Sequence, residues 1–158
     1  MMVDGLLYPL HLAISQNWKI HYFSADMADR AEHRAEEAEF LADMPGVLGS
    51  KAMAALQQVQ ASLGLDYGGI DFGLNQDGEI LLFEANATMV VEQPNVDPRW
   101  DYRRAAVERI HDAVRSMFLT SAAAGLRGLA VSSPKQPQAG CTKSNQPALC
   151  GIERDSPA

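Results

Sequence analysis

The sequence predicts an α+β protein in which helices pack on an antiparallel sheet. Residues 68–74 and 79–85 are apolar runs separated by the turn residues Asp77-Gly78, as in a β-hairpin. Three other segments carry apolar or small residues at helical spacing, which indicates the helices. With 158 residues, 47% of them hydrophobic and 21% charged, the chain has the size and composition of one globular domain.

The first segment is predicted to form strands. Asp4-Gly5 is a hairpin turn signal, but almost nothing precedes it to serve as a partner strand. We therefore expect the chain to begin in the middle of a domain. Residues 6–14 and 18–23 are predicted as the next strands, and the second of them alternates between two faces.

Two helices are predicted before the hairpin. Residues 29–42 are charged and alanine-rich, which indicates a half-exposed helix with the small face Ala31, Ala35, Ala38 and Ala42. Ser50 can cap the next helix, which ends at Gly64, since glycine favours the left-handed conformation found after helix C-termini. The apolar face of this second helix is Met53, Leu56, Val59 and Leu63.

A third helix is predicted after the hairpin. Asp97-Pro98 marks its start, and its apolar face is Val107, Ile110, Val114, Met117 and Phe118. Beyond about residue 130 the chain has few large apolar side chains and many Pro, Ser and Gln residues, so we expect a disordered tail. Cys141 and Cys150 lie in this tail without CxxC spacing, which favours free thiols over a disulfide or a metal pair.

Charge and hydropathy argue against two classes of partner. The net charge of −7 and the pI near 5.0 argue against a basic face for DNA or RNA, although a local basic pocket for a nucleotide remains open. Residues 6–17 are uncharged but contain Pro9 and His11, and no Lys or Arg precedes them. This pattern fits neither a signal peptide nor a membrane helix. We expect a cytoplasmic protein without nucleic-acid or membrane partners.

The predicted hairpin places three polar side chains on one face. A regular four-residue turn puts Leu74 opposite Glu79 and Asp71 opposite Leu82. Asp71 and Glu84 are then diagonal neighbours with Cα atoms about 7–8 Å apart. Since side chains alternate with period two, Asn86 shares their face. The other face, predicted to pack against a helix, carries Ile70, Phe72, Leu81 and Phe83, whereas Ile80 and Leu82 share the acidic face.

Two carboxylates and an amide at this spacing indicate a cation site. Ligand sets made of oxygen alone suit hard cations such as Mg²⁺, which takes one or two carboxylates and completes its shell with water and phosphate oxygens. No Cys or His lies in this stretch, which argues against zinc. The alternative is an ordinary hairpin with a solvated aspartate and glutamate at its end.

Asp71, a DG turn and Glu84-Ala85-Asn86 together resemble the metal-binding hairpin of the ATP-grasp superfamily, which includes D-alanine–D-alanine ligase, glutathione synthetase and the ribosomal-protein glutamate ligases. The flanking sequences GLDYGGIDFGL and FEANATM add to the resemblance, as does the amphipathic helix before the hairpin. The resemblance is strongest over about residues 50–95 and extends more loosely over residues 2–120. The chain is also similar to ATP-grasp segments at the C-termini of bacterial tetratricopeptide-repeat proteins.

The resemblance implies a metal and nucleotide site. Asp71 would bind one Mg²⁺, Glu84 would bridge two Mg²⁺ ions and Asn86 would bind the second, with Mn²⁺ as an alternative. Glu84 and Asn86, together with Lys19, would contact ATP. The implied reaction is ligation: a carboxylate of a small molecule or peptide attacks the γ-phosphate, an acyl phosphate forms, and an amine or similar nucleophile displaces phosphate.

Two departures from the superfamily pattern matter. Many members carry an arginine two residues before the metal-binding aspartate, and here that residue is Gly69. The earlier lobe that grips ATP in the superfamily is also not identifiable. We therefore expect residues 1–125 to form a partial ATP-grasp catalytic lobe that depends on an upstream lobe or a partner chain, followed by a tail over residues 126–158.

Several charged residues are candidates for supporting roles. Lys19 could reach a phosphate, or it could be a solvent-facing strand lysine. Arg99, Arg103 and Arg104 are candidates for the charge that Gly69 lacks, and Arg103 is the one assigned to catalysis; alternatively the chemistry differs. The histidines, His11, His21 and His33, are assigned to surface or hydrogen-bonded structural positions rather than to catalysis or metal binding.

Two other functions remain open at this level. The chain could be a non-catalytic remnant that keeps the fold and acts as an interaction module. It could also be a carboxylate-pair hydrolase. The hydrolase is disfavoured because such sites hold their carboxyl groups about 5 Å or more apart around a sugar and keep one of them in an apolar pocket.

Overall fold

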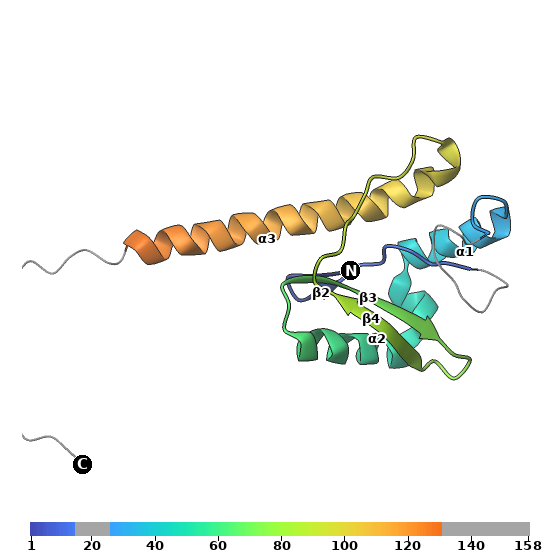
Figure 1. Cartoon of the computed structure of the whole chain (residues 1–158), viewed down its shortest axis with the longest axis horizontal. Helices are drawn as coiled ribbons and strands as arrows, with labels where there is room; N and C mark the ends of the chain where they lie inside the picture. The colour runs from blue at the N-terminus through green and yellow to red at the C-terminus, as the bar shows by residue number, and fades with distance from the viewer. Residues whose placement is uncertain (15–25, 131–158) are drawn as a thin grey trace, which may run out of the picture.

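The structure, a computed structural model, describes residues 1–14 and 26–130 and confirms the α+β class (Figure 1). The predicted strand at residues 18–23 and the tail beyond residue 130, with Cys141 and Cys150, lie outside the described residues. The elements in chain order are β1 (Met2–Val3), β2 (Leu6–Leu7), α1 (Ala31–Ala42), α2 (Met44–Leu63), β3 (Tyr67–Leu74), β4 (Ile80–Asn86), the 3₁₀ helix η2 (Pro98–Arg103) and α3 (Arg104–Ala130).

The sheet has the strand order β2-β1-β3-β4, and all three pairs are antiparallel. Asp4 and Gly5 both have positive φ, at 47° and 78°, as a two-residue hairpin turn requires. The expectation that too little chain precedes this turn to form a partner strand was wrong. Met2–Val3 forms β1, which pairs with β2 across the turn and with β3 on its other side.

The predicted strand over residues 6–14 is shorter than expected. Within the described residues it is limited to Leu6–Leu7, where it pairs with β1. Pro9, two residues after Leu7, has no N–H to donate to a ladder, which explains the early end of β2.

Helices α1 and α2 form the larger core with one face of the sheet. Phe40, Leu41 and Leu56 are buried in this core, and Ile70 and Phe72 of β3 pack against it. The predicted alanine face of α1 is not its buried face. The buried residues are Glu37, Phe40 and Leu41, because the large side chains at this helical spacing gain more from burial than the alanines do.

Helix α2 begins before the predicted start. Asp43 accepts a hydrogen bond from the Gly46 N–H at 3.0 Å and caps a first turn. Gly49, with φ 76° and ψ 167°, interrupts the helix one residue before Ser50, the predicted cap. Gly64 adopts the left-handed conformation, with φ 60°, and confirms the predicted end.

Helix α3 covers the other face of the sheet near β1. The Asp97 side chain accepts from the Arg99 N–H at 3.0 Å, but the predicted helix begins as the 3₁₀ turn η2 and becomes α-helical at Arg104. Val107 and Ile110 are fully buried, whereas Phe118 is 65% exposed and does not extend the predicted apolar face. The helix runs past the sheet (Figure 1) and continues to Ala130, five residues beyond the predicted domain end at residue 125.

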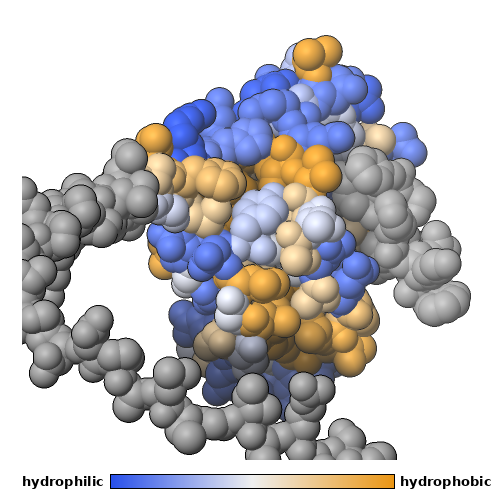
Figure 2. All heavy atoms as spheres, turned by 60° about the vertical axis from the view of Figure 1, so that its left-hand side comes forward, coloured by the Kyte–Doolittle hydropathy of each residue, from blue (hydrophilic) through white to orange (hydrophobic). Residues whose placement is uncertain are grey.

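In the part of the chain that the structure describes, no helix combines the length and the apolar character needed to cross a membrane. Apolar side chains nevertheless remain at the surface, among them Leu6, Leu81, Phe83 and Val90. Figure 2 shows hydrophobic patches in the middle and lower parts of one face, next to hydrophilic regions.

We predict that Gly64→Ala destabilises the protein by about 1 kcal/mol, because a β-carbon is strained at φ 60°. An added methyl group meets no other atom there, so strain is the only cost. Gly64→Asn is the matched control and should lose about half as much, since asparagine tolerates this conformation. Urea unfolding measures both variants, and equal losses would contradict the assignment.

Candidate functional site

The β3–β4 hairpin is held by its turn and by α2. Asn75 Oδ1 accepts from the backbone N–H groups of Asp77 at 3.0 Å and Glu79 at 2.8 Å. Lys51 of α2 donates through Nζ to the Asp77 carbonyl oxygen and to Glu79 Oε1, both at 3.1 Å. These contacts fix the turn relative to the helix, and with it the positions of both strands.

The structure brings Asp71, Glu84 and Asn86 together. Asp71 lies directly opposite Glu84, and Gly69 lies opposite Asn86. The predicted shared face is therefore present, but the predicted diagonal register was wrong. The strands meet with Leu74 opposite Ile80, and a β-bulge shifts the register between Asp71 and Phe72. Asp71 and Glu84 are closer than predicted, since directly opposed residues have Cα atoms about 4.5–5.5 Å apart.

The same register changes the predicted apolar faces of β4. Ile80 packs against the α1–α2 core, although it was expected on the acidic face. Leu81, opposite Gly73, is 64% exposed, and Phe83 is 67% exposed, although both were expected to pack under a helix. The Phe83 ring lies over Gly73, where a β-carbon would come within 3.0 Å of its Cζ atom. The acidic pair therefore has exposed apolar neighbours.

Asn86, the last residue of β4, is oriented by Thr88, two residues further on. Its Oδ1 accepts from the Thr88 N–H at 2.8 Å and from the Thr88 hydroxyl at 2.9 Å, while its Nδ2 donates to Glu84 Oε1 at 3.4 Å. The amide nitrogen thus faces the Glu84 carboxylate. Since an amide binds a metal through its oxygen, a metal shared with Glu84 requires the Asn86 side chain to rotate.

The donor set fits a hard cation whose shell is completed by other oxygens. Asp71 and Glu84 are exposed and can approach a hydrated ion, and Asn86 adds a neutral oxygen after rotation. Within residues 1–14 and 26–130, no group of three or more His, Cys, Asp or Glu side chains is arranged to hold a metal. A site made of these residues therefore depends on water or phosphate oxygens, as Mg²⁺ sites do.

Gly69 is covered by a side chain that the sequence analysis did not single out. A β-carbon at Gly69 would lie 2.4 Å from Met89 Cγ and 2.9 Å from its Cε and Sδ atoms. Met89 itself is held by the Tyr67 hydroxyl, which donates to the Met89 carbonyl oxygen at 2.6 Å. The space beside Gly69 is therefore filled by a thioether side chain from the loop after β4.

Arg103 lies in a buried cluster rather than on the acidic face. Its Nη2 donates to His11 Nδ1 at 2.6 Å, and its Nε is 3.9 Å from Glu37 Oε1. Glu37 is fully buried, accepts from the Leu12 N–H at 3.2 Å and is hydrogen-bonded by the Tyr102 hydroxyl. Burial, and next the Arg103 charge, lower the pKa of His11 to about 3. His11 is therefore a neutral imidazole.

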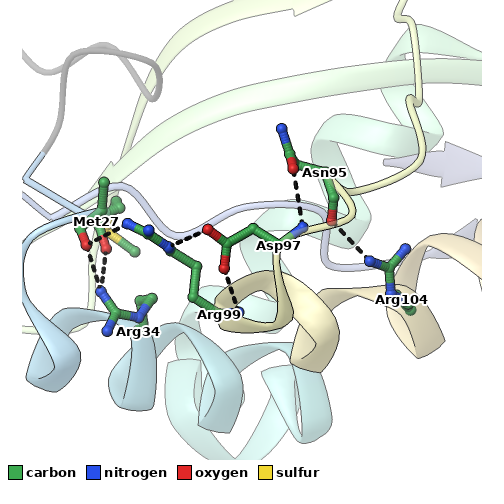
Figure 3. A network of polar contacts seen from close by, with 7 residues as sticks. Met27, Arg34, Asn95, Asp97, Arg99 and Arg104 are labelled. Carbon is green, nitrogen blue, oxygen red and sulfur yellow. Dashed lines mark hydrogen bonds and ion pairs between the residues drawn. The ribbon is translucent and has the colours of Figure 1, made fainter.

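The other arginines considered for the charge that Gly69 lacks contact the loop that leads to α3. Arg99 Nε donates to Asp97 Oδ2 at 2.8 Å, and Arg104 donates to the Asn95 carbonyl oxygen at 2.7 Å (Figure 3). Arg104 also donates to the Pro94 carbonyl oxygen at 3.3 Å. Arg34 of α1 donates to the carbonyl oxygens of Met27 and Ala28 in the same network. Arg99 and Arg104 thus hold this loop in place. Lys19 lies outside the described residues.

The sequence carried a signal for one residue that was missed. Glu37, Phe40, Leu41 and Met44 follow the spacing i, i+3, i+4, i+7, which places a carboxylate on an apolar helical face. A buried carboxylate requires partners, and this one has several. Met89 and Thr88 gave no comparable signal, because their roles depend on how the loop after β4 folds back.

Comparisons with models of known protein families, with curated proteins and with solved structures found no match to this chain.

We predict that Glu37→Gln destabilises the protein by about 3 kcal/mol, because it removes a buried counter-charge of Arg103. Glu36→Gln, an exposed substitution one residue earlier on the same helix, is the matched control and should change stability by less than about 0.5 kcal/mol. Urea unfolding at neutral pH measures both. A loss below about 1 kcal/mol for Glu37→Gln would contradict the cluster's role.

We predict that stability falls between pH 7 and pH 5 partly through His11. The pKa of His11 is about 3 in the folded chain against 6.5 for the free side chain, so the unfolded chain takes up a proton first as the pH falls below about 6.5. After allowance for the partial exposure of His11, its contribution to the loss of stability is on the order of 1 kcal/mol.

His11→Asn keeps an acceptor for Arg103 but does not titrate, so it should lose less stability between pH 7 and pH 5 than the original chain. Urea unfolding at the two pH values measures the difference. Equal losses in both proteins would show that His11 is not held neutral.

Proposed function

We propose that this chain is the catalytic lobe of an ATP-dependent ligase of the ATP-grasp type, which joins a carboxylic acid to an amine or a similar nucleophile. The observation that supports it most is the direct pairing of Asp71 with Glu84, with Asn86 hydrogen-bonded to Glu84 on the same exposed face. Three oxygen-bearing side chains from adjacent strands then converge where a hydrated cation and a phosphate can reach them.

In this proposal Asp71, Glu84 and Asn86 would hold the magnesium. Bound magnesium supplies charge neutralisation and alignment for the transferring phosphoryl group. The chain's own contribution is the rigid spacing of the ligands, which the Asn75 turn and Lys51 maintain. Lys19 is the proposed phosphate contact.

The proposed reaction has two steps. A carboxylate oxygen of the substrate attacks the γ-phosphorus of ATP and the bond to ADP breaks, which gives an acyl phosphate. The amine then attacks the acyl carbon, loses a proton, and inorganic phosphate leaves. Arg103 would act on the first step indirectly, because its guanidinium is buried and its contacts include Glu37 and His11.

The exposed apolar residues beside the acidic pair are consistent with a second lobe or a partner chain that covers this face. Leu81 and Phe83 remain in contact with solvent here, although burying such side chains is favourable. An upstream lobe or a partner chain that grips ATP against the hairpin would cover them. The proposed setting is the cytoplasm, where ATP and magnesium are available.

The same exposed residues favour one alternative, a non-catalytic interaction module. In that case Leu81 and Phe83 would be the contact surface, and the carboxylates would have no ligand. Metal and nucleotide binding separates the two functions.

We predict that the chain binds Mg²⁺–ATP, and that Glu84→Gln abolishes the binding, because the substitution keeps the shape but removes the shared charge. Isothermal titration calorimetry of the purified chain with ATP, with and without magnesium, is the measurement. Glu92→Gln is the control, since it removes one negative charge from an exposed loop residue and should leave binding unchanged. Equal binding by both variants would refute the site, and absence of binding in all three proteins would refute nucleotide binding by this chain on its own.

A further inference from the structure

A small cavity lies beside Asp71, next to the candidate metal ligands. Its volume is about 80 Å³, and it lies between residues 7–11, the β3 residues 69–72 and the α1–α2 core. The lining is mainly apolar and includes Leu10, Met44, Leu56, Ile70 and Met89, whereas Asp71 and His11 contribute ionisable side chains. The cavity therefore joins an apolar interior to the acidic face.

Gly69 and Met89 form the wall nearest to the metal ligands. Position 69 is a glycine, so no charged side chain extends from it into the cavity. Met89 fills the space over Gly69 instead. Methionine is flexible and polarizable, so it adapts to small apolar groups of different shape. This wall favours an apolar occupant over a second carboxylate, which would lose its hydration there. Met1 also lines the cavity, but its α-amino group already donates to the Tyr8 carbonyl oxygen at 2.7 Å, and burial lowers its pKa to about 6.

The size of the cavity restricts what can enter it. A water-sized centre needs about 10–15 Å³, so 80 Å³ has room for a group of roughly five non-hydrogen atoms. A branched aliphatic group of three or four carbons fits this limit, and a purine ring does not. The adenine of ATP must therefore bind elsewhere.

We propose that this cavity holds the short aliphatic side group of the carboxylic acid substrate, with the acid's carboxylate directed to the metal site at Asp71, Glu84 and Asn86. This assignment rests on the proposed ligase function and narrows its substrate class to small aliphatic acids. His11 forms part of the polar rim. Its Nδ1 accepts from Arg103, which places the imidazole proton on Nε2 and keeps the rim uncharged at that residue.

The methionines provide a direct test by NMR of the full chain labelled with ¹³C in the methionine methyl groups. Four of the seven methionines line the cavity, namely Met1, Met2, Met44 and Met89, while Met27, Met53 and Met117 do not. The first probe is isobutyramide, a neutral analogue that does not need a metal ion. It should shift the resonances of Met44 and Met89 and leave those of Met53 and Met117 in place.

Met89→Ala widens the cavity and should move the preference from isobutyramide toward the larger cyclohexanecarboxamide by several-fold. Met53→Ala, at a half-buried methionine outside the cavity, is the matched control and should leave the preference unchanged. No shift at Met44 or Met89 up to the solubility limit of the amide, or shifts of equal size at Met53 and Met117, would overturn the proposal.

Two further titrations separate this proposal from the ligase function. Mn²⁺ should broaden the Met89 methyl resonance in the original chain but not in Glu84→Gln, which tests the metal site alone. Isobutyrate should then bind only with Mg²⁺ present, and more tightly than succinate. Metal binding without any amide or isobutyrate response would overturn the cavity assignment and leave the ligase proposal standing. Amide binding without metal binding would overturn the substrate assignment together with the ligase proposal.

Discussion

The register between β3 and β4 determines which side chains of the hairpin enter the core and which face outward. A shift of one residue in an antiparallel pair moves every side chain of one strand to the opposite face. In this chain the register is set twice, first by the turn over residues 75–79 and again by the bulge opposite Asp71 and Phe72. The turn places Ile80 in the core, and the bulge brings Glu84 opposite Asp71. Both the larger core and the acidic pair depend on this arrangement.

The two features that set the register, the turn and the bulge, explain which parts of the hairpin could be predicted from the sequence. The five-residue turn moves β4 by one residue from the expected pairing, so the faces of Ile80 and Leu81 are the reverse of the prediction. The bulge adds a second shift, and two shifts of one residue restore the original faces. Glu84 and Asn86 therefore lie on the predicted face with a partner that was not predicted. Alternation of residue types identifies a shared face, but it cannot locate a bulge.

A similar distinction applies to the helices and their charged residues. The left-handed Gly64 and the start of regular helix at Ser50 follow from local backbone preferences, which the sequence states directly. The burial of Arg103 depends instead on contacts with His11 and Glu37, residues 92 and 66 positions away. From the sequence, an arginine in a charged segment is a candidate for catalysis, because the partners that it has in the folded chain are not visible there. Glu37 gave a signal in the sequence for this buried cluster, since a carboxylate on an apolar helical face needs a cation or hydrogen-bond donors nearby.

The acidic pair itself is an electrostatic cost in the chain alone. Two carboxylates on directly opposed residues repel each other, and in the described part of the chain neither Asp71 nor Glu84 forms an ion pair. The Met1 ammonium attracts Asp71 without forming an ion pair, Gly69 contributes no side-chain charge, and the Asn86 amide offers only a long hydrogen bond to Glu84. A bound cation would remove this repulsion and stabilise the folded chain by mass action. The turn and the bulge thus act in the same direction, since both keep the two negative charges on directly opposed residues.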